Sequence, residues 1–115
     1  MSQIRIVRIH NELLGTYGDQ GNAEVLEFRA KFHGITANII DVSYNDDLPT
    51  NGDIYLLGGA EDAAQLLSLE ALLRGDNLST LQMAIERGAV ILAVCAGFQI
   101  IGNRFVANGQ EVDGL

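Results

Sequence analysis

Short apolar runs alternate with longer segments of helical periodicity along most of this chain. Four of the short runs are rich in β-branched residues or leucine, which is typical of buried strands. They are Ile4 to Ile9, Thr36 to Val42, Asp53 to Leu57 and the run that leads from Ala89 into Cys95. Because these runs are apolar on both faces, the alternation predicts an α/β fold with a doubly wound parallel sheet.

The first helix is expected between the first two strands, from about Gly21 to His33. Asp19 lies where a side chain would cap its first turn, and Gly34 is a typical stop signal. The apolar positions of this helix fall on one stripe, which consists of Val25, Phe28 and Phe32.

Two further helices are expected between the third and fourth strands. The first runs from Glu61 to Arg74 and is closed by Gly75, and the second is capped by Asn77 or Ser79 and ends at Gly88. Their apolar positions are Leu66, Leu69, Leu72 and Leu73 in the former and Leu78, Leu81 and Ile85 in the latter.

The segments between these elements carry turn signals. Glu12 to Asn22 is expected to be a long turn with glycines at every third position, and Ser43 to Gly52, which contains the only proline, a surface loop. Arg104 to Ala107 is expected to be extended, and Asn108-Gly109 to form the turn that follows it.

Size and charge restrict the classes of function. With 115 residues, of which 48% are apolar, the chain is long enough for a real core but for no more than one domain. Its net charge of −8 argues against binding to nucleic acid or to an anionic membrane surface. No apolar run is long enough to cross a bilayer, so no membrane insertion is expected.

Cysteine and histidine are scarce. A single cysteine cannot form an intramolecular disulfide, and no signal-like segment opens the chain, so a cytoplasmic location is expected. With two histidines and no Cys/His cluster, neither a metal nor another cofactor is expected.

The boundary between strand and helix at Cys95 has the pattern of a nucleophile elbow. A sharp turn pushes the side chain at the turn outward, and small neighbours such as Ala96 and Gly97 permit that strained position. A helix N-terminus favours the thiolate, and the N–H of Ala96 is a natural oxyanion donor. A lone cysteine among valines and leucines is, however, equally typical of a small buried core residue.

Gly58 and Gly59 directly follow the third predicted strand. Two glycines there allow backbone N–H groups to approach a ligand, although a tight connection from strand to helix explains them as well. Ligands of doubly wound sheets bind at the carboxyl ends of the strands. Gly58, Gly59 and Cys95 are therefore expected on one rim of the sheet, with candidate oxyanion donors beside a candidate nucleophile.

The first strand, turn and helix, with a second strand ending at Asp41, also suggest a dinucleotide site. The glycines are spaced G-x-x-G-x-x-G, and the turn is longer than in the G-x-G-x-x-G fingerprint. This interpretation is therefore disfavoured.

Several segments together are similar to those of one enzyme family. They are the elbow Cys95-Ala96-Gly97-Phe98-Gln99, the turn Leu57-Gly58-Gly59-Ala60-Glu61-Asp62 with Gln65, the loop Tyr17 to Asn22, and the stretch Asn108 to Leu115. In this order they resemble the class I glutamine amidotransferases, in the cobyric-acid-synthase-like (CobB/CobQ-like) branch. That branch includes the GatD-type glutaminase subunits of lipid II isoglutaminyl synthases.

The resemblance implies a flavodoxin-like fold and hydrolysis of glutamine. Cys95 would attack the side-chain amide, backbone N–H groups near Gly59 and of Ala96 would form the oxyanion hole, and Gln99 would help to hold the substrate. The ammonia would pass to an ATP-dependent, Mur-ligase-like synthetase subunit that amidates the D-glutamate of lipid II in peptidoglycan synthesis. No role follows for the loop Tyr17 to Asn22.

The chain departs from the family pattern in its histidines. The family's catalytic histidine lies on a later strand, whereas His10 and His33 both precede Cys95. The resemblance thus implies that residues 1–115 are the N-terminal part of a single glutamine amidotransferase domain, incomplete at the C-terminus. Such a part is expected to be nearly inactive alone and to self-associate through its uncovered sheet edge. Ala63 and Ala64 also replace polar residues that are common in the family.

Two alternatives remain at this level. One is a cobyric or cobyrinic acid amidotransferase domain, although such proteins usually carry an N-terminal ATP-using domain. The other is a noncatalytic flavodoxin-like interaction module in which Cys95 is a buried core residue.

Overall fold

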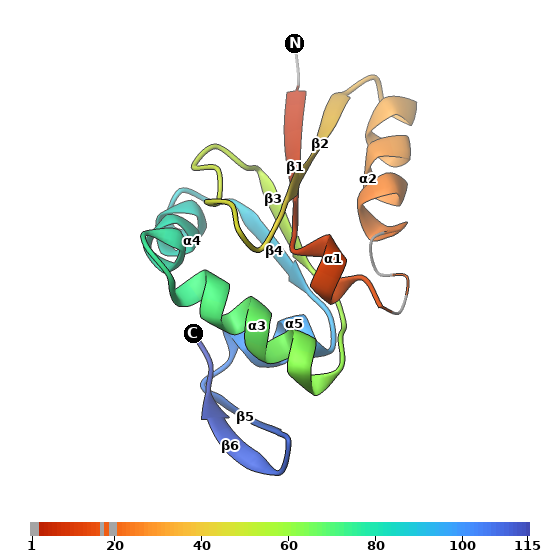
Figure 1. Ribbon diagram of the computed structural model, residues 1–115. Coiled ribbons are helices and arrows are strands. Elements are labelled where there is room, and N and C mark those ends of the chain that lie inside the picture. Colours follow the sequence, from red (N-terminus) through yellow and green to blue (C-terminus); the bar gives the residue numbers. More distant parts are fainter. Residues whose placement is uncertain (1–2, 17, 19–20) are drawn as a thin grey trace.

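The computed structural model describes residues 3–16, 18 and 21–115, and its fold is built on a parallel β-sheet (Figure 1). The helices are α1 (Asn11–Leu14), α2 (Gly21–Phe32), α3 (Asp62–Leu73), α4 (Asn77–Glu86) and α5 (Ala96–Ile101). The strands are β1 (Gln3–Ile9), β2 (Thr36–Val42), β3 (Ile54–Leu57), β4 (Val90–Ala93), β5 (Arg104–Ala107) and β6 (Gln110–Asp113). The predicted α/β fold with a parallel sheet is confirmed.

The sheet has the strand order β2-β1-β3-β4, and all of its pairs are parallel. β1 is the longer of the two inner strands, and its residues pair with β2 from Gln3 to Ile9. β3 pairs with β1 on one side and with β4 on the other. β5 and β6 form a separate antiparallel hairpin below the sheet.

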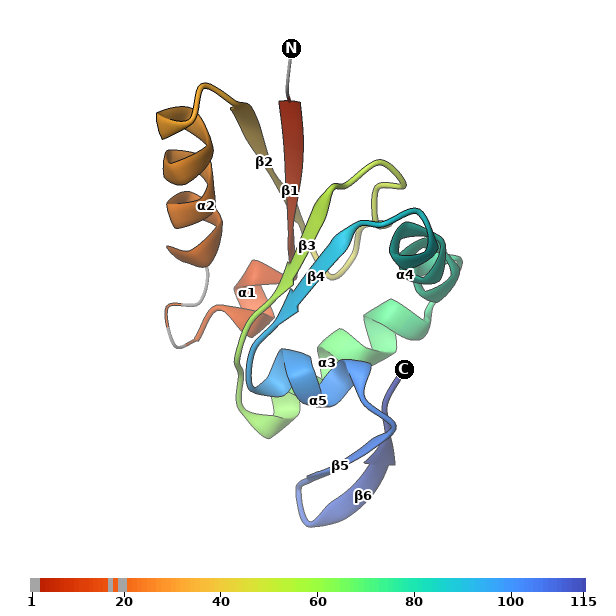
Figure 2. The same cartoon turned by 180° about the vertical axis from the view of Figure 1, so that it is seen from behind.

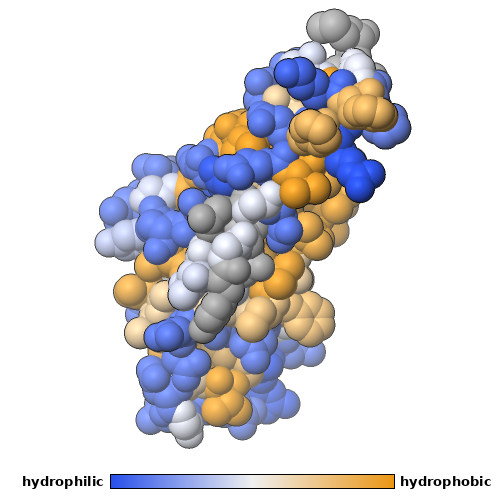
Figure 3. Space-filling view, turned by 90° about the vertical axis from the view of Figure 1, so that its right-hand side faces the viewer, coloured by the Kyte–Doolittle hydropathy of each residue, from blue (hydrophilic) through white to orange (hydrophobic). Residues whose placement is uncertain are grey.

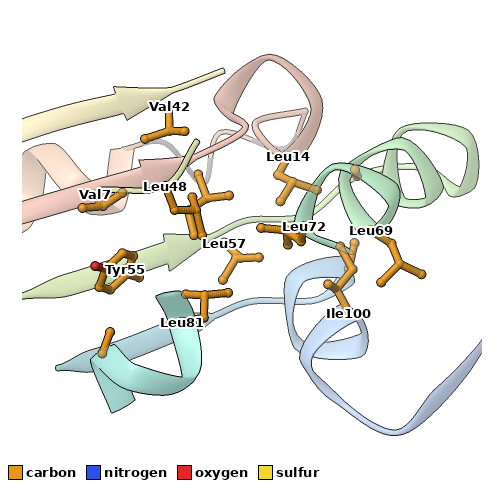
Figure 4. Close-up of a cluster of buried hydrophobic side chains, with 14 of the residues drawn as sticks. Val7, Leu14, Val42, Leu48, Tyr55, Leu57, Leu69, Leu72, Leu81 and Ile100 are labelled. Atoms are coloured by element: carbon orange, nitrogen blue, oxygen red, sulfur yellow. The ribbon is translucent and has the colours of Figure 1, made fainter. Parts of the chain in front are cut away.

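One face of the sheet carries the main core. Val7 of β1 and Tyr55 of β3 are fully buried on this face, and Leu57 continues the same row. Figure 4 shows these side chains packed with leucines of α3 and α4 and with Ile100 of α5. Alternate residues of each strand thus point toward α3, α4 and α5, and Leu14 of α1 joins the same core.

The opposite face is covered only in part by the described chain. α2 packs on β1 and β2, where Ala23 contacts a small cluster with Ile6 and Leu56. Val90 and Leu92 of β4 have the same orientation as Leu56, but they are 56% and 39% exposed. Figure 2 shows the open surface of β3 and β4 beside α2.

The predicted stripe of α2 lies on the solvent side of the helix, on the side of the molecule that Figure 3 views, where hydrophobic groups are exposed among hydrophilic ones. Its members Val25, Phe28 and Phe32 are 58%, 69% and 80% exposed, whereas Ala23 and Ala30 are buried. The alanines allow the helix to lie close to the sheet, and the large residues consequently point outward. The expectation that the largest apolar residues of a helix form its inner face is wrong here.

Other sequence predictions were met in most places. All four predicted sheet strands and the three predicted helices are present within a few residues of their expected bounds. The predicted long turn, however, contains the short helix α1, and its first residues are anchored because the Leu13 and Leu14 N–H groups donate to the His10 carbonyl. The predicted apolar positions Leu73 and Ile85 are exposed.

The predicted caps of α4 are also wrong. The N-cap residue is Asp76, and it makes no side-chain capping hydrogen bond. Asn77 is buried instead: its amide donates to the Ala71 carbonyl and its oxygen accepts from the Leu48 N–H, both at 2.9 Å. The amide therefore connects α3 to the loop before β3. Asp19, the predicted cap of α2, lies outside the described residues.

None of the helices in the described part of the chain combines the length and the apolar character that crossing a bilayer requires.

Candidate functional site

Cys95 lies between the end of β4 and the start of α5. Its backbone has φ 54° and ψ −113°, a conformation that non-glycine residues rarely adopt and that costs about 1–3 kcal/mol. The preceding residue, Val94, still donates its N–H to the Leu57 carbonyl at 2.9 Å. The predicted sharp turn from strand to helix is confirmed, whereas its catalytic role remains a prediction.

Gly97 holds this turn against the end of β3. A Cβ at Gly97 would lie 2.6 Å from the Leu57 Cβ and 2.7 Å from the Leu57 carbonyl oxygen, so no side chain fits there. The Gly97 N–H donates to the Gly58 carbonyl at 3.0 Å. Gly58 and Cys95 therefore lie on the same rim of the sheet, as their sequence positions predicted.

The Cys95 side chain is a free thiol and is exposed. This result contradicts the alternative in which Cys95 is a buried core residue. Ala96, which follows directly, is buried, because the first turn of α5 packs against the core. The small side chains of Ala96 and Gly97 thus bring the backbone of α5 inward while the thiol stays outside.

Gln99 lies one turn after Cys95 and is joined to α3. The Gln99 N–H donates to the Cys95 carbonyl, and its side-chain oxygen accepts from Nε2 of Gln65 at 3.0 Å. Gln65 is buried. The sequence did not single out Gln65 as a site residue, although a lone glutamine in a helix that begins just after Gly58-Gly59 was a usable signal.

His10 follows the carboxyl end of β1 and is fully buried. Its Nδ1 lies 2.7 Å from Oγ of Ser68 on α3, and its Nε2 has no hydrogen-bond partner. Burial, with a smaller contribution from repulsion by Arg74, lowers the pKa of His10 to about 4. His10 is therefore a neutral buried residue at pH 7, which the sequence alone did not indicate.

Neither histidine interacts with Cys95 in the described structure. His10 is paired with Ser68, and His33 follows the end of α2, where its ring contacts Phe32. The end of α2 leads into the amino-terminal end of β2, whereas Cys95 follows the carboxyl end of β4. Because the strands are parallel, His33 and Cys95 lie at opposite ends of the sheet. In the described structure both histidines therefore contact residues other than Cys95.

The dinucleotide interpretation has no support in the surroundings of Asp41. Nε and Nη2 of Arg8 donate to the two Asp41 carboxylate oxygens at 2.6 and 2.9 Å. These hydrogen bonds lower the pKa of Asp41, and they raise the pKa of Arg8. The carboxylate that would bind a ribose is engaged by a neighbouring strand of the sheet. Tyr17 and Gln20, in the other family-like loop, lie outside the described residues.

Comparison with known proteins identifies the family. Residues 5–115 match the CobB/CobQ-like glutamine amidotransferase domain. This chain belongs to that family. The match confirms the resemblance inferred from the segments around Gly58 and Cys95. The parallel sheet is consistent with a glutamine amidotransferase fold.

Two curated proteins are similar to this chain over almost its whole length. The lipid II isoglutaminyl synthase (glutamine-hydrolyzing) subunit GatD of Streptococcus pneumoniae is 33% identical over 115 residues, which are 98% of this chain and 44% of the relative. The protein of the same name from Staphylococcus aureus is 30% identical over 118 aligned positions, which cover all of this chain and 47% of the relative. The chain spans less than half the length of these relatives.

Proposed function

We propose that this chain carries the nucleophile of a glutaminase subunit in a cytoplasmic lipid II isoglutaminyl synthase. One observation carries the proposal: in a glutamine amidotransferase chain, the only cysteine is exposed at a strained turn beside Gly58. The proposed partner is an ATP-dependent, Mur-ligase-like subunit that uses the ammonia to amidate the D-glutamate of lipid II. The names of the two GatD relatives support this choice over a cobyric or cobyrinic acid amidotransferase.

The proposed reaction is acyl transfer through the Cys95 thiolate. Sγ attacks the side-chain amide carbon of glutamine, and the carbonyl oxygen becomes an oxyanion next to the Ala96 N–H. The C–N bond breaks as the nitrogen takes up a proton, ammonia leaves, and a thioester remains. Water then attacks the thioester, which releases glutamate and restores the thiol. The Gly58-Gly59 turn borders the same position, and Gln99 is the proposed contact to the substrate.

The general acid and base of this reaction are proposed to come from outside this chain. His10 is buried against Ser68, and no hydrogen bond joins either histidine to Cys95. Loss of general acid–base catalysis costs about 10²- to 10⁴-fold in rate. The 115-residue chain alone is therefore expected to release ammonia from glutamine at no more than a trace rate.

A glutamine-analogue electrophile tests the role of Cys95. Diazo-oxo-norleucine is added to a glutaminase subunit that contains both this chain and the proposed general base, assembled with its synthetase subunit, and it is expected to label Cys95 in mass spectrometry. Cys95→Ala is expected to lower ammonia release by at least about 10³-fold. Met83→Ala, at an exposed position of α4, is the matched control and should leave the rate unchanged.

Two results contradict the proposed function. One is labelling that leaves Cys95 unmodified while glutamine is hydrolysed, and the other is ammonia release that survives Cys95→Ala. Either result would favour a noncatalytic role for the turn at Cys95.

A further inference from the structure

The exposed stripe of α2 lies on the side of the helix that faces away from the sheet. With about 100° between successive helical residues, Val25, Phe28 and Phe32 lie within an arc of about 60°. Ala23 and Ala30, which contact the sheet side, lie about 180° from the centre of this arc. A second helix beside α2 on the same face of the sheet would contact the flanks of α2 rather than this stripe.

The spacing of the stripe matches the contact seam of a pair of helices. Intervals of three and then four residues separate Val25, Phe28 and Phe32, which is the a–d–a spacing of a coiled coil. Large apolar groups with this spacing are typical of a surface that packs against another helix. Their exposures of 58%, 69% and 80% show that nothing in the described chain occupies this seam.

The charges beside the seam complement a second copy of the same helix. Glu24 and Lys31 lie on one flank of the stripe, seven positions apart, and both are exposed. Within the described residues Glu24 forms an ion pair with Arg8, in which the charged atoms lie 3.8 Å apart, and Lys31 forms no ion pair. In an antiparallel helix pair, residues on this flank face the same flank of the other helix. Glu24 then meets Lys31 of the partner subunit at both ends of the seam.

We propose that the stripe Val25, Phe28 and Phe32 is the interface of a symmetric dimer in which α2 packs antiparallel against α2 of a second copy. A two-fold axis near Phe28 makes the interface isologous, so one apolar seam and two identical ion pairs form together. A parallel pair would place Glu24 opposite Arg29 and leave Lys31 unpaired. Lys31 therefore distinguishes the two orientations.

The dimer is expected to be weak. At about 150–250 Å² for each buried aromatic ring, the two stripes together bury on the order of 800 Å². Stable interfaces bury about 1,200–2,000 Å². Each copy also carries a net charge of −8, which opposes association at low salt. The monomer and the dimer should therefore coexist in the range of about 10 μM to 1 mM.

Sedimentation equilibrium of the 115-residue chain at about 0.15 M salt tests the interface. The wild-type chain is expected to dimerise reversibly, and the double variant Phe28→Ser/Phe32→Ser to remain monomeric. Val90→Ser is the matched control, because it removes a 56% exposed side chain from the open face of β4. It should leave the dimer constant unchanged. Circular dichroism should show the same fold in all three chains, since the substituted residues are exposed.

Charge reversal tests the orientation. Glu24→Lys and Lys31→Glu are each expected to weaken the dimer about threefold to tenfold, and the double reversal to restore it. The proposal is overturned by a wild-type chain that stays monomeric at about 1 mM, or by a dimer that Val90→Ser removes and the phenylalanine variant does not. It is also overturned if the double reversal fails to restore the dimer. None of these outcomes depends on the glutaminase activity.

Discussion

At the scale of single residues, the absence of a side chain at Gly97 is as important to the site as the thiol of Cys95. Gly97 lets α5 approach the end of β3 closely enough for its N–H to reach the Gly58 carbonyl. The turn that exposes Cys95 is in this way held by backbone contacts. The geometry of the turn at Cys95 therefore depends on Gly97, a residue that has no reactive side chain.

Gly97→Ala is expected to lower the free energy of unfolding by about 1–3 kcal/mol, because its Cβ would collide with Leu57. Denaturation by urea measures the change. The matched control is Gly21→Ala at the start of α2, where a Cβ meets nothing within 4 Å and the substitution should be neutral or slightly stabilising. Equal stability of the Gly97→Ala and wild-type chains would show that the approach of α5 to β3 is not tight.

His10 is expected to make stability depend on pH. Its pKa of about 4 in the folded chain is below the ordinary value of 6.5, so unfolding takes up a proton between these values. The contribution of neutral His10 is complete above pH 6.5 and is lost as the pH falls to 4, by up to about 3 kcal/mol. Unfolding by urea at several pH values measures this slope.

His10→Asn should flatten the pH dependence between 6.5 and 4, because asparagine tolerates the left-handed backbone of this position and does not titrate. His33→Asn, which replaces the other histidine at an exposed position after α2, is the matched control. If both variants lose stability on acidification as the wild-type chain does, carboxylates rather than His10 carry the effect.

At the scale of elements, the β5–β6 hairpin is joined to the start of α3. Its turn has Asn108 at φ 51° and Gly109 at φ 74°, which is the conformation that an Asn-Gly pair favours. The Asn108 N–H donates to a carboxylate oxygen of Asp62 at 2.7 Å. The hairpin thereby packs next to α3 and α5, where Phe105 and Ala107 join the main core.

Asp62→Ala removes this acceptor. It is expected to have a larger effect on local opening of the hairpin than on the stability of the whole chain. The β5 and β6 amides should exchange with deuterium several times faster, while the free energy of unfolding falls by no more than about 1 kcal/mol, because the bond is exposed. Glu111→Gln, which breaks the exposed ion pair with Arg104, is the control and should change little. Unchanged exchange in Asp62→Ala would show that the core contacts alone hold the hairpin.

At the scale of the whole molecule, the two faces of the sheet differ in how well they are covered. In the described chain α1, α3, α4 and α5 contribute to the core on one face, whereas α2 covers part of the other face and leaves Val90 and Leu92 of β4 exposed. Local opening therefore costs less at the β4 edge than in the centre, where Ile6, Val7 and Tyr55 have no exposed surface.

Hydrogen exchange of the wild-type chain should reflect this order. The amides of β1 and β3 are expected to exchange slowest, and those at the outer edge of β4 faster by at least about tenfold. Mass spectrometry or nuclear magnetic resonance measures the rates. Slower exchange in β4 than in β1 would show that a second copy or another partner covers the edge strand in solution.

The sequence by itself determined the elements, because their signals are local. Runs of β-branched residues predicted the four sheet strands, and glycines at 34, 75 and 88 predicted where helices end. The small residues after Cys95 predicted the turn from strand to helix, since only the backbone and its nearest neighbours decide that geometry. The segments around Gly58 and Cys95 also indicated the amidotransferase family, which the family match over residues 5–115 confirms.

Only the tertiary structure decided which side of each element is buried. The pattern of α2 contains both an alanine side and a phenylalanine side, and contact with Ile6 and Leu56 selected the alanines. Burial of His10 against Ser68, exposure of Cys95 and the bond between Gln65 and Gln99 likewise join residues far apart in the sequence. Which side chains are buried and which distant residues meet depends on the shapes of the neighbouring elements. The periodicity of a single segment gives no information about those shapes.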